Sequence, residues 1–446
     1  MVHTFKFEDI LLALDVESGA VHMLDELSFN AVNAVNSGMD PNSLPYPNED
    51  IQDVLNEIEE LKSGKMFDCP APLPVNRGGQ NVIKAMCLHV AHDCNLRCKY
   101  CFASTGDFHG ERKMMSLEVG KRALDFLMEH SGKRKHLEVD FFGGEPLMNF
   151  EVVKDLVEYG RESEKKYDKQ INFTITTNCV GLNDEIIGFI NREMHNVVIS
   201  LDGRKSVHDS MRPTVNNKGS FDIIVPKAQK LIAERGDKEY YARGTFTSKN
   251  LDFAKDVEAL VDLGFRQVSV EPVILPENSP YAILAEHIPS IRSQYDLLAK
   301  MLLSHRKEGK WFNFFHFMID LENGPCLKKR VTGCGAGNEY VAVTPDGDIY
   351  PCHQFVGHES FNMGSVIDNN LREDIRNKFK ECNIETKRAC SNCWAKYHCS
   401  GGCAANAYIF NGDIRKPYEL TCELEKKRTE CAIGICIKER EENDKV

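Results

Sequence analysis

Between residues 81 and 280 the sequence repeats one pattern, an apolar strand-like segment followed by an amphipathic helix. Helical periodicity occurs at residues 117–128, 150–159, 183–191, 221–233 and 251–263. The strand-like segments are residues 85–91, 137–142, 171–176, 196–200, 240–246 and 266–272. Strands that alternate with helices form a parallel sheet, so the fold class is α/β and the expected architecture is a partial (β/α)6 barrel similar to a TIM barrel. Its active site belongs at the carboxyl ends of the strands.

A chain of 446 residues exceeds one ordinary core, so further domains are expected around this barrel. Residues 1–65 combine a β-hairpin with two helical segments, the pattern of a small winged-helix domain, although a plain packing appendage would look the same. The expected division is a winged-helix-like module at 1–65, a Pro- and Gly-rich linker at 66–80, the barrel at 81–280, a bridging region at 281–330 and a cysteine-rich domain at 331–446.

The 17 cysteines of the chain indicate metal or cluster ligands. No signal-peptide pattern opens the sequence, and no apolar run reaches the roughly 18 residues of a membrane span. We therefore expect a cytoplasmic protein with no membrane partner, and thiols stay reduced in that compartment. The net charge of −12 argues against a nucleic-acid partner, which requires a basic face.

Three cysteines directly follow the first predicted strand, Cys94, Cys98 and Cys101, spaced C-x3-C-x2-C. One loop of this kind can bind three irons of a [4Fe–4S] cube and leave the fourth iron without a protein ligand. A zinc knuckle is the alternative, although structural zinc usually has four ligands in C-x2-C pairs. An open iron at a strand end is a place for chemistry.

This spacing, with Tyr100 before the third cysteine, resembles the cluster loop of the radical S-adenosylmethionine (SAM) enzymes, in which the open iron chelates SAM. The segment Gly143-Gly144-Glu145-Pro146 matches the family's GGEP motif, which binds the SAM amino group, and its glycines allow close backbone approach. The resemblance also implies that the Tyr100 main chain meets the adenine. It further assigns SAM contacts to Thr177, Asn178, Ser200, Asp202 and Arg243.

Some of these residues have an ordinary structural alternative. Ser200 and Asp202 also suit turn caps, and Arg243 also suits a buried ion pair.

A second group of cysteines matches, at seven positions, the SPASM domain, a C-terminal extension with two auxiliary clusters found in peptide-modifying radical SAM enzymes. The resemblance implies four ligands for one auxiliary cluster, Cys390, Cys393, Cys399 and Cys422, and three for the other, Cys334, Cys352 and Cys403.

The sulfatase-maturing branch of the family differs from this chain at two positions. It has a further cysteine where this chain has Tyr340, and an aspartate base where this chain has His353. The auxiliary cluster of Cys334, Cys352 and Cys403 is therefore expected to keep an open iron, which a substrate cysteine thiolate could occupy. The alternative is that Cys326, Cys431 or Cys436 closes that site.

Motifs and domain order together most resemble the thioether-forming maturases of six-cysteine-in-forty-five peptides, of the ranthipeptide and sactipeptide type. The resemblance implies three [4Fe–4S] clusters and SAM. SAM cleavage then yields a 5′-deoxyadenosyl radical that removes hydrogen from an acceptor residue, threonine by analogy, and a peptide cysteine bonds to that carbon. Implied partners are a cysteine-rich precursor, whose leader adds a strand to residues 1–65, and a flavodoxin- or ferredoxin-type electron donor.

Two other functions fit the same sequence. One is another SPASM-type peptide modification, either oxidation or carbon–carbon crosslinking. The other is a zinc-stabilised peptide-binding scaffold without catalysis.

Overall fold

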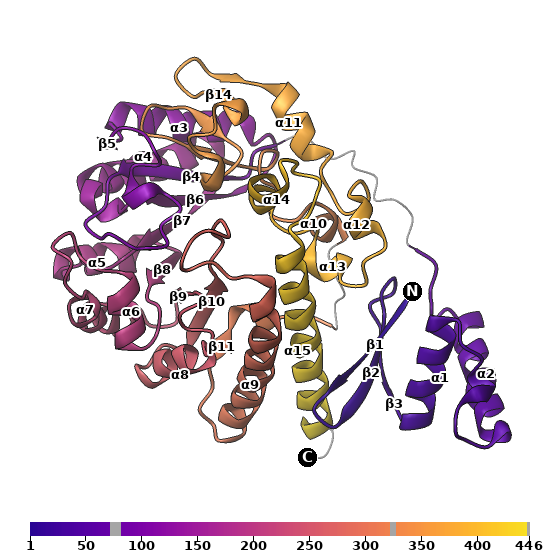
Figure 1. The fold of residues 1–446 in the computed structure, drawn as a ribbon. Helices are drawn as coiled ribbons and strands as arrows, with labels where there is room; N and C mark the ends of the chain where they lie inside the picture. Colours follow the sequence, from indigo (N-terminus) through magenta and orange to yellow (C-terminus); the bar gives the residue numbers. More distant parts are fainter. Residues whose placement is uncertain (72–81, 322–326, 444–446) are drawn as a thin grey trace.

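A computed structural model describes residues 1–71, 82–321 and 327–443 (Figure 1). Its centre is a ten-stranded sheet in which the barrel strands pair in parallel, in the order β11-β10-β9-β8-β7-β6-β4. These strands are β4 (Ala85–His92), β6 (His136–Gly143), β7 (Gln170–Thr177), β8 (Asn196–Ser200), β9 (Glu239–Phe246), β10 (Gln267–Pro272) and β11 (Asn313–Phe314). Their helices are α3 (Leu117–His130), α4 (Phe150–Tyr167), α5 (Asp184–Glu193), α6 (Lys205–Met211), α7 (Phe221–Ala233) and α8 (Ala254–Asp262).

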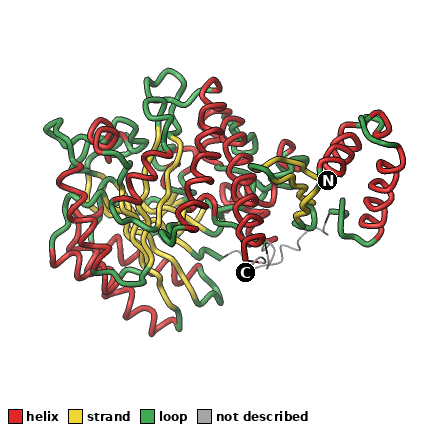
Figure 2. The backbone as a smooth tube through the Cα atoms, turned by 90° about the horizontal axis from the view of Figure 1, so that it is seen from below, coloured by secondary structure: helices red, strands yellow, loops and turns green. Residues whose placement is uncertain are grey.

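The predicted α/β class and partial barrel are confirmed. The strand core lies inside a layer of helices (Figure 2), and each end of the six predicted strands lies within one residue of its expected position. The alternation of side chains explains this agreement: Val139 and Phe141 of β6 are fully buried beneath the helices, whereas Asp140 and Phe142 face the barrel interior. The short strand β11 was not predicted.

The cysteine-rich region is built onto the barrel. Strand β12 (Tyr340–Val343) pairs in parallel with β4, and β13 (Ile349–Tyr350) extends the sheet beyond it. The long helix α15 (Glu419–Asn443) lies beside α9 (Ile288–Lys307) of the bridging region (Figure 1). The remaining elements are β5 (Lys113–Met114), β14 (Gly364–Ser365), β15 (Asn370–Leu371), α10 (Leu327–Thr332), α11 (Glu373–Lys380), α12 (Arg388–Ser391), α13 (Lys396–Cys399) and α14 (Ala404–Asn411).

The N-terminal module has a three-stranded antiparallel sheet in the order β1-β2-β3, followed by two helices. Its elements are β1 (Val2–Phe7), β2 (Ile10–Asp15), β3 (Val21–Leu24), α1 (Glu26–Ser37) and α2 (Asn48–Ser63). The hairpin of β2 and β3 lies where the sequence predicts it, whereas β1 was not predicted, because the adjacent polar residues His3 and Thr4 interrupt its alternation.

The N-terminal module is docked on the cysteine-rich region. The ring of His3 in β1 stacks on Trp394 with centroids 3.7 Å apart. The carboxylate of Glu17 accepts hydrogen bonds from Lys396 Nζ at 2.6 Å and from the Tyr397 hydroxyl at 3.0 Å. Glu17 and Lys396 are both largely buried, so this contact is a fixed part of the fold.

Two features of the sequence analysis fall outside the described residues, namely most of the predicted linker at 66–80 and Cys326. Within the described ranges, no helix is both long and apolar enough to cross a membrane.

Candidate active site and cluster-binding residues

The loop at residues 93–102, here called the SAM-cluster loop, begins where β4 ends, and the structure brings its three cysteines together. Burial raises the pKa of Cys94 to about 12, and the charges of Glu145, Cys98 and Cys101 add to that effect. Burial likewise raises the pKa of Cys98 to about 11. Thiols in such surroundings become thiolates when they bind a metal cation, so this donor set fits an iron–sulfur cluster.

No three Cys, His, Asp or Glu side chains in the described ranges lie close enough together to hold a single metal ion.

A buried network holds the SAM-cluster loop in place. The Tyr100 hydroxyl donates to Asp202 Oδ2 at 2.6 Å, and the Arg212 guanidinium donates to Asp202 Oδ1 at 3.0 Å. The backbone N–H of Thr245 donates to the same Asp202 Oδ1 at 2.9 Å, and Asp202 is fully buried. Donors of this chain thus bond to both carboxylate oxygens of Asp202, so this residue positions the loop.

Main-chain hydrogen bonds fasten the same loop to the segment that follows α6. The N–H of Arg97 donates to the carbonyl of Pro213 at 2.8 Å, and the N–H of Lys99 donates to that of Met211 at 2.9 Å. The loop is thus fixed by backbone as well as side-chain bonds.

The two glycines after β6 bring that strand against the SAM-cluster loop. A Cβ on Gly144 would lie 2.1 Å from the carbonyl oxygen of Asp93, and one on Gly143 would lie 2.2 Å from that of Ala91. The N–H of Glu145 donates to the Asp93 carbonyl at 2.9 Å. The close approach that these glycines permit is therefore to the loop itself.

Glu145, Thr177 and Asn178, predicted at separate strand ends, are neighbours. Glu145 Oε1 accepts from the Thr177 hydroxyl at 2.7 Å, and Oε2 accepts from the backbone N–H of Asn178 at 2.7 Å. Burial raises the pKa of Glu145 to about 7, against the lowering effect of these bonds. The side-chain amide of Asn178 donates to Cys94 Sγ at 3.6 Å and to Asn95 at 2.8 Å.

Ser200 and Arg243 lie opposite each other on β8 and β9 and face the barrel interior. Ser200 is half-buried, and Arg243 is exposed. Burial alone would raise the pKa of Glu271 on β10, but His316, Arg428 and Arg243 together lower it to about 2. The interior therefore holds an accessible cation, which suits a ligand carboxylate.

The cysteines at 334, 352 and 403, here called the three-thiol group, lie together at the barrel edge. Burial raises the pKa of Cys352 to about 12, and the charges of Cys403 and Cys334 add to it. Cys334 and Cys403 are exposed. The thiol of Cys87 on β4 is near this group, because the charge of Cys352 is one of the influences that raise its pKa.

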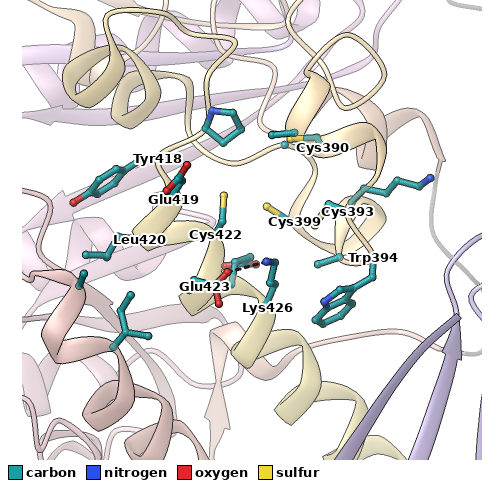
Figure 3. A pocket seen from close by; sticks show the side chains of 18 of the residues that line it. Cys390, Cys393, Trp394, Cys399, Tyr418, Glu419, Leu420, Cys422, Glu423 and Lys426 are labelled. Atoms are coloured by element: carbon teal, nitrogen blue, oxygen red, sulfur yellow. Dashed lines mark hydrogen bonds and ion pairs between the residues drawn. The ribbon is translucent and has the colours of Figure 1, made fainter. Parts of the chain in front are cut away.

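The cysteines at 390, 393, 399 and 422, here called the four-thiol group, line a cavity of about 680 Å³ (Figure 3). Burial raises the pKa of Cys399 to about 12, and Glu425, Cys422 and Cys390 contribute. In Figure 3 the sulfur atoms of Cys399 and Cys422 turn toward the same space. Both predicted groups in the cysteine-rich region are thus assembled by the fold.

Two of the late cysteines lie elsewhere. The thiol of Cys431, fully buried in α15, is 3.9 Å from Asp296 Oδ1. The thiol of Cys436 is 3.8 Å from the carbonyl of Ile319. Among the described cysteines, those whose charges raise the pKa of Cys352 are Cys403 and Cys334, not these two.

Sequence reasoning missed the polar residues of the barrel interior and Arg212, which belongs to the buried network around Asp202. The signal for the interior residues was strand alternation: Asp140 has the same orientation as Phe142, and Glu271 the same as Ser269. No comparable pattern marks Arg212.

A three-cysteine loop at the top of a partial barrel, with two more cysteine groups at its edge, defines an iron–sulfur protein with several cluster sites. Two family models match, a 4Fe-4S single cluster domain over residues 79–225 and the SPASM iron-sulfur cluster-binding domain over residues 334–394.

Individual proteins are similar over most of the chain. The cysteine-type anaerobic sulfatase-maturating enzyme of Clostridium novyi is 28% identical over 341 residues, 70% of this chain and 86% of that protein. The solved structure of anSMEcpe with bound AdoMet and Cp18Cys peptide has the same fold, with a TM-score of 0.65, 19% identity and coverage of 79% of this chain and 98% of that one. Streptococcus suis SuiB bound to precursor peptide SuiA aligns with a TM-score of 0.54 and 15% identity, over 92% of this chain and 97% of that one.

The chain thus carries a 4Fe-4S single cluster domain and a SPASM domain, the domain pair of the radical SAM enzymes that it resembles, and its cofactors are [4Fe–4S] clusters and SAM.

Proposed function

We propose that this chain is a peptide maturase that bonds a cysteine sulfur to a carbon of an acceptor residue, threonine by analogy, in a ribosomally made, cysteine-rich precursor. The observation that carries the proposal is the three-thiol group. Its members lie beside the barrel interior with Tyr340, not a cysteine, at the position where the sulfatase-maturing branch has a further ligand. A cluster held by three thiolates retains an iron that a substrate thiolate can bind.

In this proposal Cys94, Cys98 and Cys101 hold the SAM cluster. When bound, that cluster and SAM supply the radical chemistry that removes a hydrogen atom from the acceptor carbon. Residues at the strand ends orient SAM: Gly143, Gly144, Glu145, Thr177, Asn178, Ser200 and Arg243, together with the main chain of Tyr100. The buried network around Asp202 keeps the loop in register with them.

The four-thiol group would hold a third, fully ligated cluster, which would supply a route for the surplus electron. A flavodoxin- or ferredoxin-type protein is the proposed electron donor to the SAM cluster.

The N-terminal module is the proposed binding site for the leader of the precursor. The similar structures of anSMEcpe and SuiB were solved with peptides bound. In this chain β1, at one edge of the small sheet, lies against the cysteine-rich region, while β3 pairs with β2 on one side and with no other strand of the described ranges. An extended leader can add to that edge through main-chain hydrogen bonds.

The test is co-expression with a six-cysteine-in-forty-five precursor. Each crosslink should make the peptide lighter by the thiol hydrogen and one carbon-bound hydrogen, and fragmentation should locate a sulfur–carbon bond. The variant Cys352→Ala should return the peptide unmodified, and the matched control Cys436→Ala should not change the yield. An unchanged peptide mass with the wild-type enzyme would refute the proposal, and a carbon–carbon bond or an oxidised residue would indicate another SPASM-type activity.

A further inference from the structure

We propose that Asp140 of β6 is the base that removes the proton from the substrate cysteine thiol in the barrel interior. This inference rests on the proposed function, and it assigns a proton acceptor to a reaction in which His353 stands at the position of the aspartate base of the sulfatase-maturing branch.

The position of Asp140 places its carboxylate in the right compartment. Its neighbours Val139 and Phe141 are fully buried under the helices, so Asp140 points to the interior together with Phe142. The ring of Phe142 lies 5.1 Å from that of His353, the residue after Cys352. The interior face of β6 therefore borders the three-thiol group.

Two residues connect Asp140 with that group. Cys87 on β4 is directly opposite Asp140 in the sheet register and is fully buried. The charges of Asp140 and Cys352 both act on Cys87, and the Tyr340 hydroxyl is hydrogen-bonded to it. Burial raises the pKa of the same Tyr340, and the charges of Cys87, Asp140 and Cys352 add to that effect. A substrate thiol that approaches Cys352 along this wall therefore passes near the Asp140 carboxylate.

A second acidic residue of this interior, Glu271, is less suitable as a base. Glu271 lies 3.6 Å from His316 Nε2, and the surrounding charges stabilise its ionised form, which makes it a weak proton acceptor. Asp140 forms no ion pair within the described residues, and its hydrogen bond comes from the neutral hydroxyl of Thr176 at 3.3 Å.

The electrostatics support the same assignment. Burial raises the pKa of Asp140 to about 7, against smaller lowering effects of Thr176 and Arg243. The ionisable groups near it are Cys87 on β4, Tyr340 on β12 and Arg243 on β9. A carboxylate that titrates near neutral pH is a suitable general base.

The proposed step transfers one proton and no electrons. The S–H bond of the substrate cysteine breaks, the proton bonds to an Asp140 oxygen, and the sulfur keeps the electron pair as a thiolate, the form that binds a metal. The carboxylic acid then returns its proton to water after the product leaves.

The first test counts protons at binding and requires no turnover. The holoenzyme is titrated calorimetrically at pH 8 in buffers of different ionisation enthalpy. One ligand is a six-cysteine-in-forty-five precursor that retains a single cysteine, and the other has serine in place of that cysteine. For the wild type we expect almost no difference in proton release between the two peptides, because the negative charge of the bound thiolate raises the pKa of the adjacent Asp140 carboxyl further and keeps the proton on it. For Asp140→Asn we expect the cysteine peptide to release about one more proton into the buffer, because a metal-bound thiol must lose its proton. Equal release by wild type and Asp140→Asn would overturn the inference.

The second test is the pH profile of crosslinking. At pH 7 the rate for Asp140→Asn should fall by about 100-fold or more, and it should recover toward pH 9, where a thiol with a pKa of about 8.5 ionises unaided. Formation of 5′-deoxyadenosine should continue, and Asp140→Glu should restore part of the rate. The matched control is Glu138→Gln, an exposed carboxylate on the same strand, which should behave as wild type.

An Asp140→Asn profile parallel to the wild-type profile would contradict the inference while leaving the proposed function standing. If the wild-type enzyme neither binds the cysteine peptide nor crosslinks it, the proposed function itself fails.

Discussion

The chain brings the cysteines of the SAM-cluster loop and those of the three-thiol group together in different ways. The loop takes its three cysteines from one short segment, and a buried network of Asp202, Tyr100 and Arg212 holds that segment from beneath. The three-thiol group gathers cysteines from distant segments, and Cys334 and Cys403 are exposed. The first site is shaped by one segment and the network around it, whereas the second is formed by segments from different parts of the chain and is more exposed.

The largest effect is expected from Cys98→Ala. Loss of one ligand of the SAM-cluster loop should reduce SAM cleavage to background, measured as 5′-deoxyadenosine formed with dithionite, because SAM reacts at the open iron. Iron in the other two groups should remain. Cys431→Ala, which replaces a buried cysteine of α15 beside Asp296, is the control and should cleave SAM normally. Retained cleavage in Cys98→Ala would contradict the ligand assignment.

Breaking the ion pair between Arg212 and Asp202, which holds the SAM-cluster loop, should show the next largest effect. Arg212→Met leaves the fully buried carboxylate of Asp202 without its ion-pair partner, and breaking such a pair costs about 3–5 kcal/mol of unfolding free energy. Denaturant unfolding of the barrel measures this cost.

The double variant Asp202→Asn with Arg212→Met removes both charges and serves as the control for that prediction. It should be less destabilised than Arg212→Met alone. Equal destabilisation of the single and double variants would mean that the loop is not held by this charge pair.

The N-terminal module supports the cysteine-rich region from outside, and Glu17→Gln should weaken that support. The change removes the charge that Lys396 and Tyr397 bind, at a cost of about 1–3 kcal/mol. Hydrogen exchange should become faster in β1 and in the segment around Trp394. Glu57→Gln alters an exposed carboxylate of α2 and should leave exchange unchanged. The same exchange pattern in both variants would show that the docking contact is not important.

The smallest effect is expected from cysteines that we do not assign as ligands of the three-thiol group. Cys87→Ala, Cys326→Ala and Cys436→Ala should each retain the wild-type iron content, measured chemically after anaerobic purification. A loss of about four irons in any of these variants would show that this cysteine closes the cluster.

How much the sequence predicted depended on how local each feature is. The barrel strands and the loop of Cys94, Cys98 and Cys101 were predictable because alternation and spacing are properties of short segments. The other two cysteine groups followed only from the resemblance to the SPASM domain. The network of Asp202 and Arg212 was not, because it joins residues that only the folded chain brings together.

Other features were missed for the same reason. The pairing of β12 with β4 links segments far apart in the sequence. Strand β11 has only two residues, too few for any periodicity. The position of Asp140 beside Cys87 depends on the register of two neighbouring strands.

The most direct test of the central claim, that this chain uses its cysteines to hold three clusters, is the iron and sulfide content of anaerobically prepared wild-type protein. We predict about twelve irons and twelve sulfides per chain, as three [4Fe–4S] clusters require. A colourless preparation that contains zinc and almost no iron would contradict the account.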